Sequence, residues 1–259
     1  MCVYKIYVKG SLFVLLFVSF INCNSQKKKN IESINVTSKT DTFPKYPKYL
    51  NKNYVLGKFD YTKNTDFVVV PKKISNKKIY VRKEVLTAFL KMQNEANKNN
   101  ISFKVISGTR NFTHQKRIWN YKWNEKYKNI PVEKRVLKIL EFSAMPSTSR
   151  HHWGTDLDLN NLNNSYFSSG KGLKEYNWLI KNASKFGFYQ VYTSKKNGRT
   201  GYNEEKWHWS YLPLSSIYLT FYNQKITNKD ITNFKGEAFI GKIDVIKNFV
   251  NGINSKIVK

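Results

Sequence analysis

The sequence predicts a domain that combines helices with short strands. Apolar runs at residues 66–71, 101–106 and 188–192 have the length and composition of strands, and proline or polar residues follow them. Residues 81–98 carry apolar side chains at intervals of three and four, which predicts an amphipathic helix. Apolar and aromatic residues make up 41% of the chain, which is enough for a packed core and argues against a disordered chain.

Four further segments follow the same two periodicities. Polar and apolar residues alternate around Asp156 and Asp158, which places both carboxylates on one face of a strand and the leucines on the other. A helical pattern later in the chain stops at Gly187, a residue that commonly ends helices. The expected helices lie at 111–127 and 173–186, and the expected strands at 155–159 and 207–211.

The composition also divides the chain into parts. Residues 24–45 are rich in Lys, Ser, Thr and Asn without apolar periodicity, which predicts a flexible tether. A globular domain is expected at 46–213. Residues 214–259 are expected to form a C-terminal helical extension that ends in an amphipathic helix around 238–253.

The first 23 residues have the features of an export signal. Two lysines precede the apolar run at 11–21, which is too short to cross a bilayer comfortably. The run ends at Cys23 and the chain then turns polar, which resembles a bacterial lipoprotein signal with Cys23 as the acylated residue. We therefore expect an exported lipoprotein, anchored in the membrane and facing the periplasm or the cell surface. Because Asn22 is larger than the usual residue there, an ordinary signal peptide or a membrane anchor remains an alternative.

The formal net charge of +28 permits binding to a polyanion such as nucleic acid or an anionic cell wall. The basic residues are spread along the chain, however, and no nucleic-acid motif accompanies them. A high content of Lys, Asn and Ile can also result from the base composition of the genome, which would explain the charge without a polyanionic partner. We expect no nucleic-acid partner, and a cell-wall polymer is the better candidate of the two. The only cysteines are Cys2 and Cys23, so the chain beyond them cannot form a disulfide.

Two stretches contain three of the four histidines and several carboxylates. In the first, His151 and Asp158 are seven residues apart with a glycine between them. In the second, His208 follows Glu205 by three residues. Two histidines and a carboxylate form a ligand set that catalytic zinc uses, with one position left for water. Buried structural histidines, turn-capping aspartates and solvated glutamates would explain the same residues without a metal.

Glu205 needs a particular local geometry to act beside such a metal. In an ideal strand, side chains three residues apart face opposite ways, so a turn or bulge is required between Glu205 and His208. With that turn, the Glu205 carboxylate could take a proton from water and pass it to a leaving amine. Trp207 would shield the site and strengthen the effect of its charges.

Three motifs in order resemble the D-alanyl-D-alanine carboxypeptidase family of the VanY type, which belongs to the zinc D,D-peptidases of the LAS group. The motifs are Ser107-Gly-Thr-Arg110-Asn with Gln115; Ser149, His151, Gly154 and Asp158; and Glu205, Trp207 and His208. The resemblance runs from about Tyr46 to Tyr211. It implies an α+β fold, with a small, mainly antiparallel sheet flanked by helices and a zinc site on the sheet.

The resemblance also implies roles for individual residues. His151, Asp158 and His208 would bind zinc, with Glu205 as the catalytic base. Arg110 would bind the substrate carbonyl or carboxylate and stabilise the oxyanion. The contacts to the terminal D-amino acid would come from Gln115 and Ser149.

Two positions depart from the family pattern. Thr109 stands where tyrosine is usual, and Asp156 stands where alanine is common. Asp156 could support a zinc-binding histidine from outside the metal shell, or it could change what the pocket accepts. The sequence is compatible with both alternatives.

The resemblance implies a zinc-dependent enzyme that removes the terminal D-alanine from peptidoglycan stem peptides, and we expect it to act as a monomer. An L,D-carboxypeptidase or a cell-wall endopeptidase would use the same metal site. A zinc module that binds the cell wall without catalysis is a rival from another class. The presence of Glu205 and Arg110 argues against it.

Overall fold

The computed structural model of the 259-residue chain describes residues 46–257, which belong to one compact unit. The predicted signal at 1–23, its Cys23 and the predicted tether at 24–45 lie outside the described residues. Within residues 46–257, no helix combines the length and the apolar character that crossing a membrane requires.

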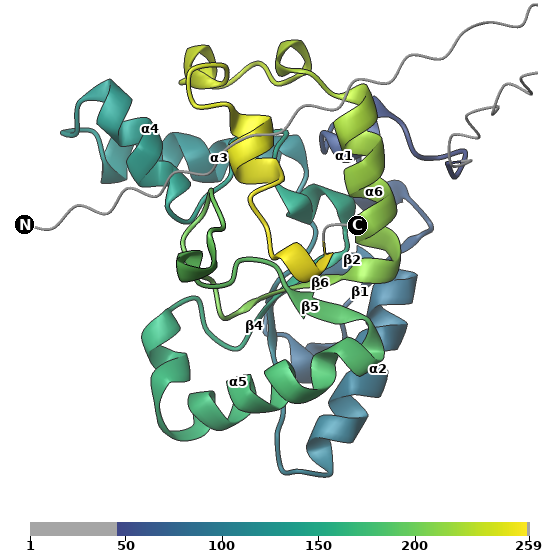
Figure 1. The fold of residues 1–259 in the computed structure, drawn as a ribbon. Coiled ribbons are helices and arrows are strands. Elements are labelled where there is room, and N and C mark those ends of the chain that lie inside the picture. Colours follow the sequence, from purple (N-terminus) through teal and green to yellow (C-terminus); the bar gives the residue numbers. More distant parts are fainter. Residues whose placement is uncertain (1–45, 258–259) are drawn as a thin grey trace, which may run out of the picture. The chain divides into compact units, whose positions relative to one another are not determined.

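Two small antiparallel sheets form the centre of the structure, as expected for the α+β class (Figure 1). The larger sheet has the strand order β3-β4-β6-β5, and β1 pairs with β2 in a separate ribbon. Every pair is antiparallel. The strands are β1 Phe67–Val69, β2 Tyr80–Arg82, β3 Val105–Ser107, β4 Asp156–Leu159, β5 Phe188–Gln190 and β6 His208–Tyr211.

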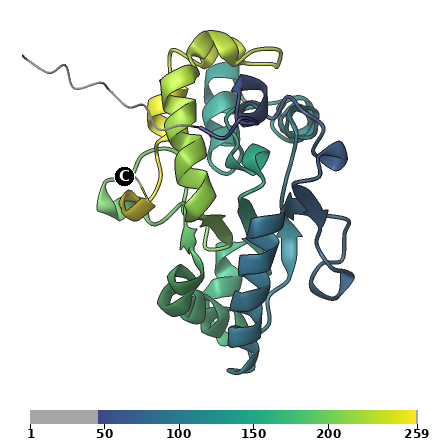
Figure 2. The same cartoon turned by 90° about the vertical axis from the view of Figure 1, so that its right-hand side faces the viewer.

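Helices cover both faces of the larger sheet. Figure 1 shows α2 and α5 on one side, and α3, α4, α6 and the C-terminal segment on the other. Figure 2 shows α6, in yellow-green, rising from the strands on the side opposite α2 and α5. The helices are α1 Lys52–Val55, α2 Lys83–Asn97, α3 Phe112–Tyr121, α4 Val132–Leu140, α5 Gly170–Asn182 and α6 Leu212–Lys225.

The alternation in β4 assigns one face of the sheet to the core. Leu157 and Leu159 are buried with Trp209 of β6 against the apolar stripes of α2 and α5. Phe89 of α2 and Trp178 of α5 belong to the same cluster. The opposite face of β4 carries Asp156 and Asp158 and is therefore free to form a polar site.

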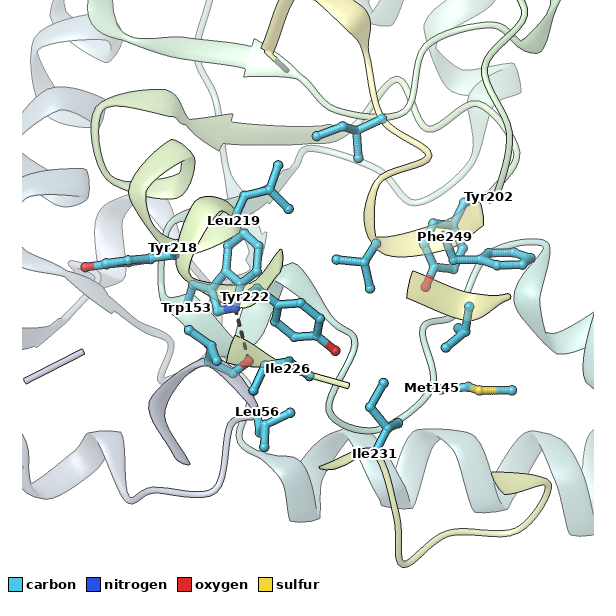
Figure 3. Close-up of a cluster of buried hydrophobic side chains, with 14 of the residues drawn as sticks. Leu56, Met145, Trp153, Tyr202, Tyr218, Leu219, Tyr222, Ile226, Ile231 and Phe249 are labelled. Carbon is cyan, nitrogen blue, oxygen red and sulfur yellow. Dashed lines mark hydrogen bonds between the residues drawn. The ribbon is translucent and has the colours of Figure 1, made fainter. Parts of the chain in front are cut away.

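A second core lies on the other side of the sheet, and the predicted C-terminal extension contributes much of it. Figure 3 shows Tyr218 and Tyr222 of α6 beside Trp153 in this cluster, with Trp153 donating a hydrogen bond of 3.1 Å to the Val55 carbonyl. Ile231 and Phe249, further along the tail, are buried in the same cluster. Residues 214–257 therefore pack into the compact unit.

Two expectations about elements need correction, and one helix was not expected. The strand expected at 101–106 begins only at Val105, because the Gln93 side chain takes the Phe103 amide hydrogen bond that a strand would use. The continuous helix around 238–253 is wrong. Gly241 and the positive φ of 47° at Asp244 interrupt it, leaving a turn of 3-10 helix at Glu237–Phe239 and a π-helical turn at Ile246–Val250. Helix α4 was not anticipated, whereas α6 forms the first part of the helical extension expected at 214–259.

Candidate active site

Strand pairing brings the predicted metal ligands together. Asp158 of β4 lies directly opposite His208 of β6, and Asp156 lies opposite Ser210. His151 comes from the 3-10 turn Arg150–Trp153 that precedes β4. Gly154 ends that turn with a φ of +73°, and a Cβ there would lie 2.4 Å from the Phe67 ring. The turn therefore depends on glycine to bring His151 back over the sheet.

The three ligand groups have a spacing that suits a zinc ion. His151 Nε2 lies 3.4 Å from Asp158 Oδ2, and His208 Nδ1 lies 3.4 Å from Asp158 Oδ1. One ligand atom from each residue falls within a span of 4.8 Å, and all three residues are buried. Tetrahedral zinc with bonds of about 2.0–2.2 Å separates its ligand atoms by roughly 3.3–3.6 Å. Asp158 Oδ1 is buried without a hydrogen-bond partner among the described residues, which suits an atom that binds a metal ion.

Each histidine ring is oriented by a hydrogen bond at the ring nitrogen that points away from Asp158. His151 Nδ1 lies 2.7 Å from the Gly108 carbonyl, so it donates its hydrogen there and leaves Nε2 toward Asp158. His208 Nε2 lies 2.8 Å from Asp156 Oδ2, which leaves Nδ1 toward Asp158. Such partners fix the tautomer and the ring orientation of metal-binding histidines.

The position of Asp156 favours one of the two alternatives left open by the sequence. Its carboxylate is fully buried and does not line the cavity. Besides His208, it accepts hydrogen bonds from Arg150 Nε at 3.0 Å, Ser210 Oγ at 2.7 Å and Thr155 Oγ1 at 2.7 Å. Burial alone would raise its pKa, but the Arg150 charge and the His208 hydrogen bond hold the pKa well below its ordinary value. Asp156 is thus an anionic support behind His208.

Glu205 lies beside the ligand cluster. Residues 206–207 form the turn that the spacing required, and the Glu205 carboxylate lies 3.1 Å from His208 Nδ1. Burial raises the pKa of Glu205, partly offset by the His208 hydrogen bond and charge. Burial lowers the pKa of His208, but its hydrogen bonds to Asp156 and Glu205 outweigh that effect and raise it to about 9. The His208 ring therefore lies between two carboxylates, those of Asp156 and Glu205.

Arg110 is held rigidly at the edge of the cluster. Its Nη1 donates to Ser107 Oγ at 2.7 Å and lies 3.7 Å from Asp158 Oδ2. Its Nε donates to Gln115 Oε1 at 3.1 Å, and the Gln115 amide nitrogen donates to the Ala144 carbonyl at 2.8 Å. Both ends of the Gln115 amide are therefore engaged within the protein. The predicted contact of Gln115 with substrate stays a prediction.

His152 was not assigned a role from the sequence, and the structure gives it a positioning one. The Ser147 amide donates to His152 Nε2 at 3.1 Å, so Nδ1 carries the hydrogen and donates to the Arg110 carbonyl at 2.7 Å. Burial lowers the pKa of His152 to about 3, which keeps the ring neutral. A Cβ at Gly57 would lie 2.3 Å from this ring, so a glycine is required there.

A cavity of about 460 Å³ opens over the cluster. All seven predicted site residues line it, whereas Thr109 is buried outside it. Trp207 also lines it, in keeping with the shielding role expected of that side chain. The wall residues that were not predicted include Lys122, Ser143, Tyr192 and Tyr202. Of these four, only Lys122 had a sequence signal, because it lies seven residues after Gln115 and hence on the same helical face.

Comparison with known proteins identifies the family of this chain. The family model "VanY: D-alanyl-D-alanine carboxypeptidase" matches residues 78–214, which is more than half of the chain. The chain belongs to this family. The residues that the family model spans include all three motifs of the site.

Individual relatives are distant. The chain is 30% identical over 141 residues to "Putative carboxypeptidase YodJ" of Bacillus subtilis, a match that covers 52% of this chain and 47% of that protein. It is 27% identical over 230 residues to a D-alanyl-D-alanine carboxypeptidase of Enterococcus faecium, covering 82% and 69%. The chain spans about half the length of the first curated relatives it matches. Among solved structures, "VanYB in complex with D-Alanine-D-Alanine" is 21% identical with a TM-score of 0.49, covering 65% of this chain and 93% of the other.

Proposed function

We propose that this protein is a zinc-dependent carboxypeptidase that hydrolyses the terminal D-alanine from peptidoglycan stem peptides. The observation that carries the proposal is the convergence of five groups in one cavity. His151, Asp158 and His208 supply a zinc ligand set, and Glu205 and Arg110 lie beside it. Membership of the family supports the same activity, and one similar solved structure is of a VanY mutant in complex with Zn(II).

The protein's own residues supply the proton transfer. When bound, zinc would act as a Lewis acid that polarises the substrate carbonyl and acidifies water. Glu205 is placed to accept the proton of the attacking water and to deliver it to the departing amine. Because burial raises its pKa, the carboxylate is a stronger base than an exposed one.

Arg110 supplies the fixed positive charge. Its hydrogen bonds to Ser107 and Gln115 hold the guanidinium in place before substrate arrives. A preorganised cation next to the ligand cluster would stabilise negative charge as it develops on the carbonyl oxygen. Ser149, buried in the cavity wall, is available to contact the terminal residue.

The test is to incubate zinc-loaded protein with defined stem peptides and to identify the products by mass spectrometry. Loss of one D-alanine from a pentapeptide ending in D-alanyl-D-alanine is the expected result. Release of D-alanine from a tetrapeptide only would replace the proposal with an L,D-carboxypeptidase, and internal cleavage would replace it with an endopeptidase. Binding of zinc and peptide without any product would leave a non-catalytic module.

We also propose that the protein is exported and anchored through a lipid on Cys23. Substitution Cys23→Ala is expected to move the protein from the membrane fraction to a soluble exported pool, because attached acyl chains supply the anchoring free energy. Fractionation and immunoblotting measure the distribution. A mutant that stays entirely in the membrane fraction would contradict lipid anchoring and favour a retained signal anchor.

A further inference from the structure

The cavity contains a cation that the proposed mechanism does not use. Lys122 follows α3 at the start of the π-helical turn Lys122–Lys126 and lines the cavity together with Gln115 and Ile118. Positions 115, 118 and 122 share one face of a continuous helical segment. The ammonium donates a hydrogen bond to Ser143 Oγ, and Ser143 is buried in the same wall.

No carboxylate in residues 46–257 forms a salt bridge with Lys122. Burial and the nearby Lys126 lower the pKa of the Lys122 ammonium, and the charge of Glu205 only partly opposes them. The other cation of the cavity, Arg110, already lies 3.7 Å from Asp158. Lys122 is therefore the cavity's poorly compensated positive charge, a position suited to an anionic part of a ligand.

The same wall shares the cavity with the metal-ligand cluster and is linked to it through hydrogen bonds. Ser143, which holds the ammonium, directly precedes Ala144, whose carbonyl accepts a hydrogen bond from Gln115. Gln115 in turn holds Arg110. In a carboxypeptidase substrate, the terminal carboxylate follows the reacting carbonyl carbon by only three bonds, a path of about 4 Å. The anion nearest to this wall would be that carboxylate.

We infer that Lys122, held by Ser143, binds the free terminal carboxylate of the substrate and makes the enzyme a carboxypeptidase. This inference rests on the proposed function. It assigns the recognition of the free terminus to a residue that none of the three motifs contains. Arg110 and Gln115 are engaged with each other, with Ser107, with Asp158 and with Ala144, which leaves Lys122 as the available charged anchor.

The test compares two synthetic peptides that end in D-alanyl-D-alanine, one with a free carboxylate and one with a terminal carboxamide. The wild type should prefer the free acid, and Lys122→Met should reduce that preference about tenfold, as expected for a lost hydrogen bond to a charged group. The loss should appear in KM rather than kcat, because the carboxylate is bound equally in the ground state and the transition state. Lys122→Arg should restore part of the preference.

Lys126→Met is the matched control, because Lys126 is exposed on the same turn and does not line the cavity. It should keep the wild-type preference. Zinc content and melting temperature are measured for each variant to check that its fold is intact. An unchanged preference in folded Lys122→Met would overturn the inference.

A binding measurement separates this inference from the proposed function. Dissociation constants for both peptides, measured by calorimetry on the same preparations, do not need turnover. If the wild type binds the free acid more tightly through Lys122 but releases no D-alanine, the proposed function fails and the anchor stands. If D-alanine is released and the acid and amide bind equally, only the anchor fails.

Discussion

Asp156 is the residue at which this chain departs most informatively from its family pattern. It stands where alanine is common. In the structure, Asp156 makes four hydrogen bonds on the far side of His208 from the metal-ligand cluster. The buried Arg150–Asp156 pair is part of the same network, and Arg150 Nη1 has no hydrogen-bond partner within residues 46–257. The negative charge of Asp156 therefore has two tasks, to orient His208 and to compensate Arg150.

Removing the charge of Asp156 should weaken metal binding. We expect Asp156→Asn to lower zinc affinity about 10–100-fold, because the amide supports the His208 ring less strongly than a carboxylate. Competition with a chromophoric chelator measures the affinity. Because the substitution leaves buried Arg150 without its counter-charge, the melting temperature must be recorded as well. A folded variant with wild-type zinc affinity would contradict the supporting role of Asp156.

The elements differ in how far the sequence predicts them. The alternation at Asp156–Leu159 was sufficient for β4, because one face of that strand is apolar and the other polar. The motif residues on β4 and β6 were also predictable, and their convergence follows from the strand register. The tail was predictable only in being helical in part. The tail is also held by contacts with distant residues, such as the hydrogen bond of 2.7 Å that Trp119 Nε1 donates to the Lys235 carbonyl, and no local pattern specifies such contacts.

The cavity wall also contains a contact that the sequence does not predict. Lys122 and Ser143 are brought together across 21 residues of sequence by the packing of α3, α4 and the loop that follows. Neither residue belongs to a motif. By contrast, Glu205 and His208 lie within one turn, so their proximity could be expected from spacing and a single bend.

An ion pair joins the tail to α1, and the pH dependence of stability tests its contribution. Asp230 accepts from Lys52 Nζ at 2.8 Å and from Thr227 in a capping box. Although burial raises its pKa, these contacts outweigh the effect and lower the pKa below its ordinary value. A lowered pKa means that the stabilisation is present above the unfolded-state pKa and is lost as the pH falls through the folded-state pKa.

We therefore expect Asp230→Asn to be less stable than the wild type at pH 7 by about 0.5–1 kcal/mol, as for a cap combined with a surface pair. The difference should shrink as the pH falls below about 4. Urea denaturation of both proteins at several pH values measures it. A difference that is constant from pH 7 to pH 3 would show that the ionised carboxylate is not responsible.

At the scale of the whole molecule, two cores hold the elements that carry the site in place. One core packs the sheet against α2 and α5. The other core packs α1 and the tail, which includes α6, against the turn that carries His151. Tyr222 of α6 connects these parts directly. Its hydroxyl donates to the Ser147 carbonyl at 3.0 Å, and its ring lies 6.3 Å from that of Trp153. The tail thus supports the loop that leads into the metal-binding turn.

Tyr222→Ala should destabilise the fold by about 3–5 kcal/mol, because it removes a large buried ring. Tyr222→Phe should cost only about 0.5–1.5 kcal/mol, since it loses the hydrogen bond and keeps the ring. Tyr121→Ala is the control, because Tyr121 is 61% exposed and a change there should stay within about 0.5 kcal/mol. Equal effects of Tyr222→Ala and Tyr121→Ala in denaturant unfolding would refute a structural role for the tail.

The division of labour between Glu205 and the ligands is the central claim, and zinc content measured together with kcat/KM on Glu205→Gln and His208→Ala tests it most directly. Glu205→Gln should keep wild-type zinc and lose roughly a hundred- to ten-thousand-fold in turnover, because an amide cannot accept the proton. His208→Ala should lose zinc and activity together, since it removes a ligand. A Glu205→Gln variant that remains active, or that loses zinc as completely as His208→Ala, would contradict this division of labour.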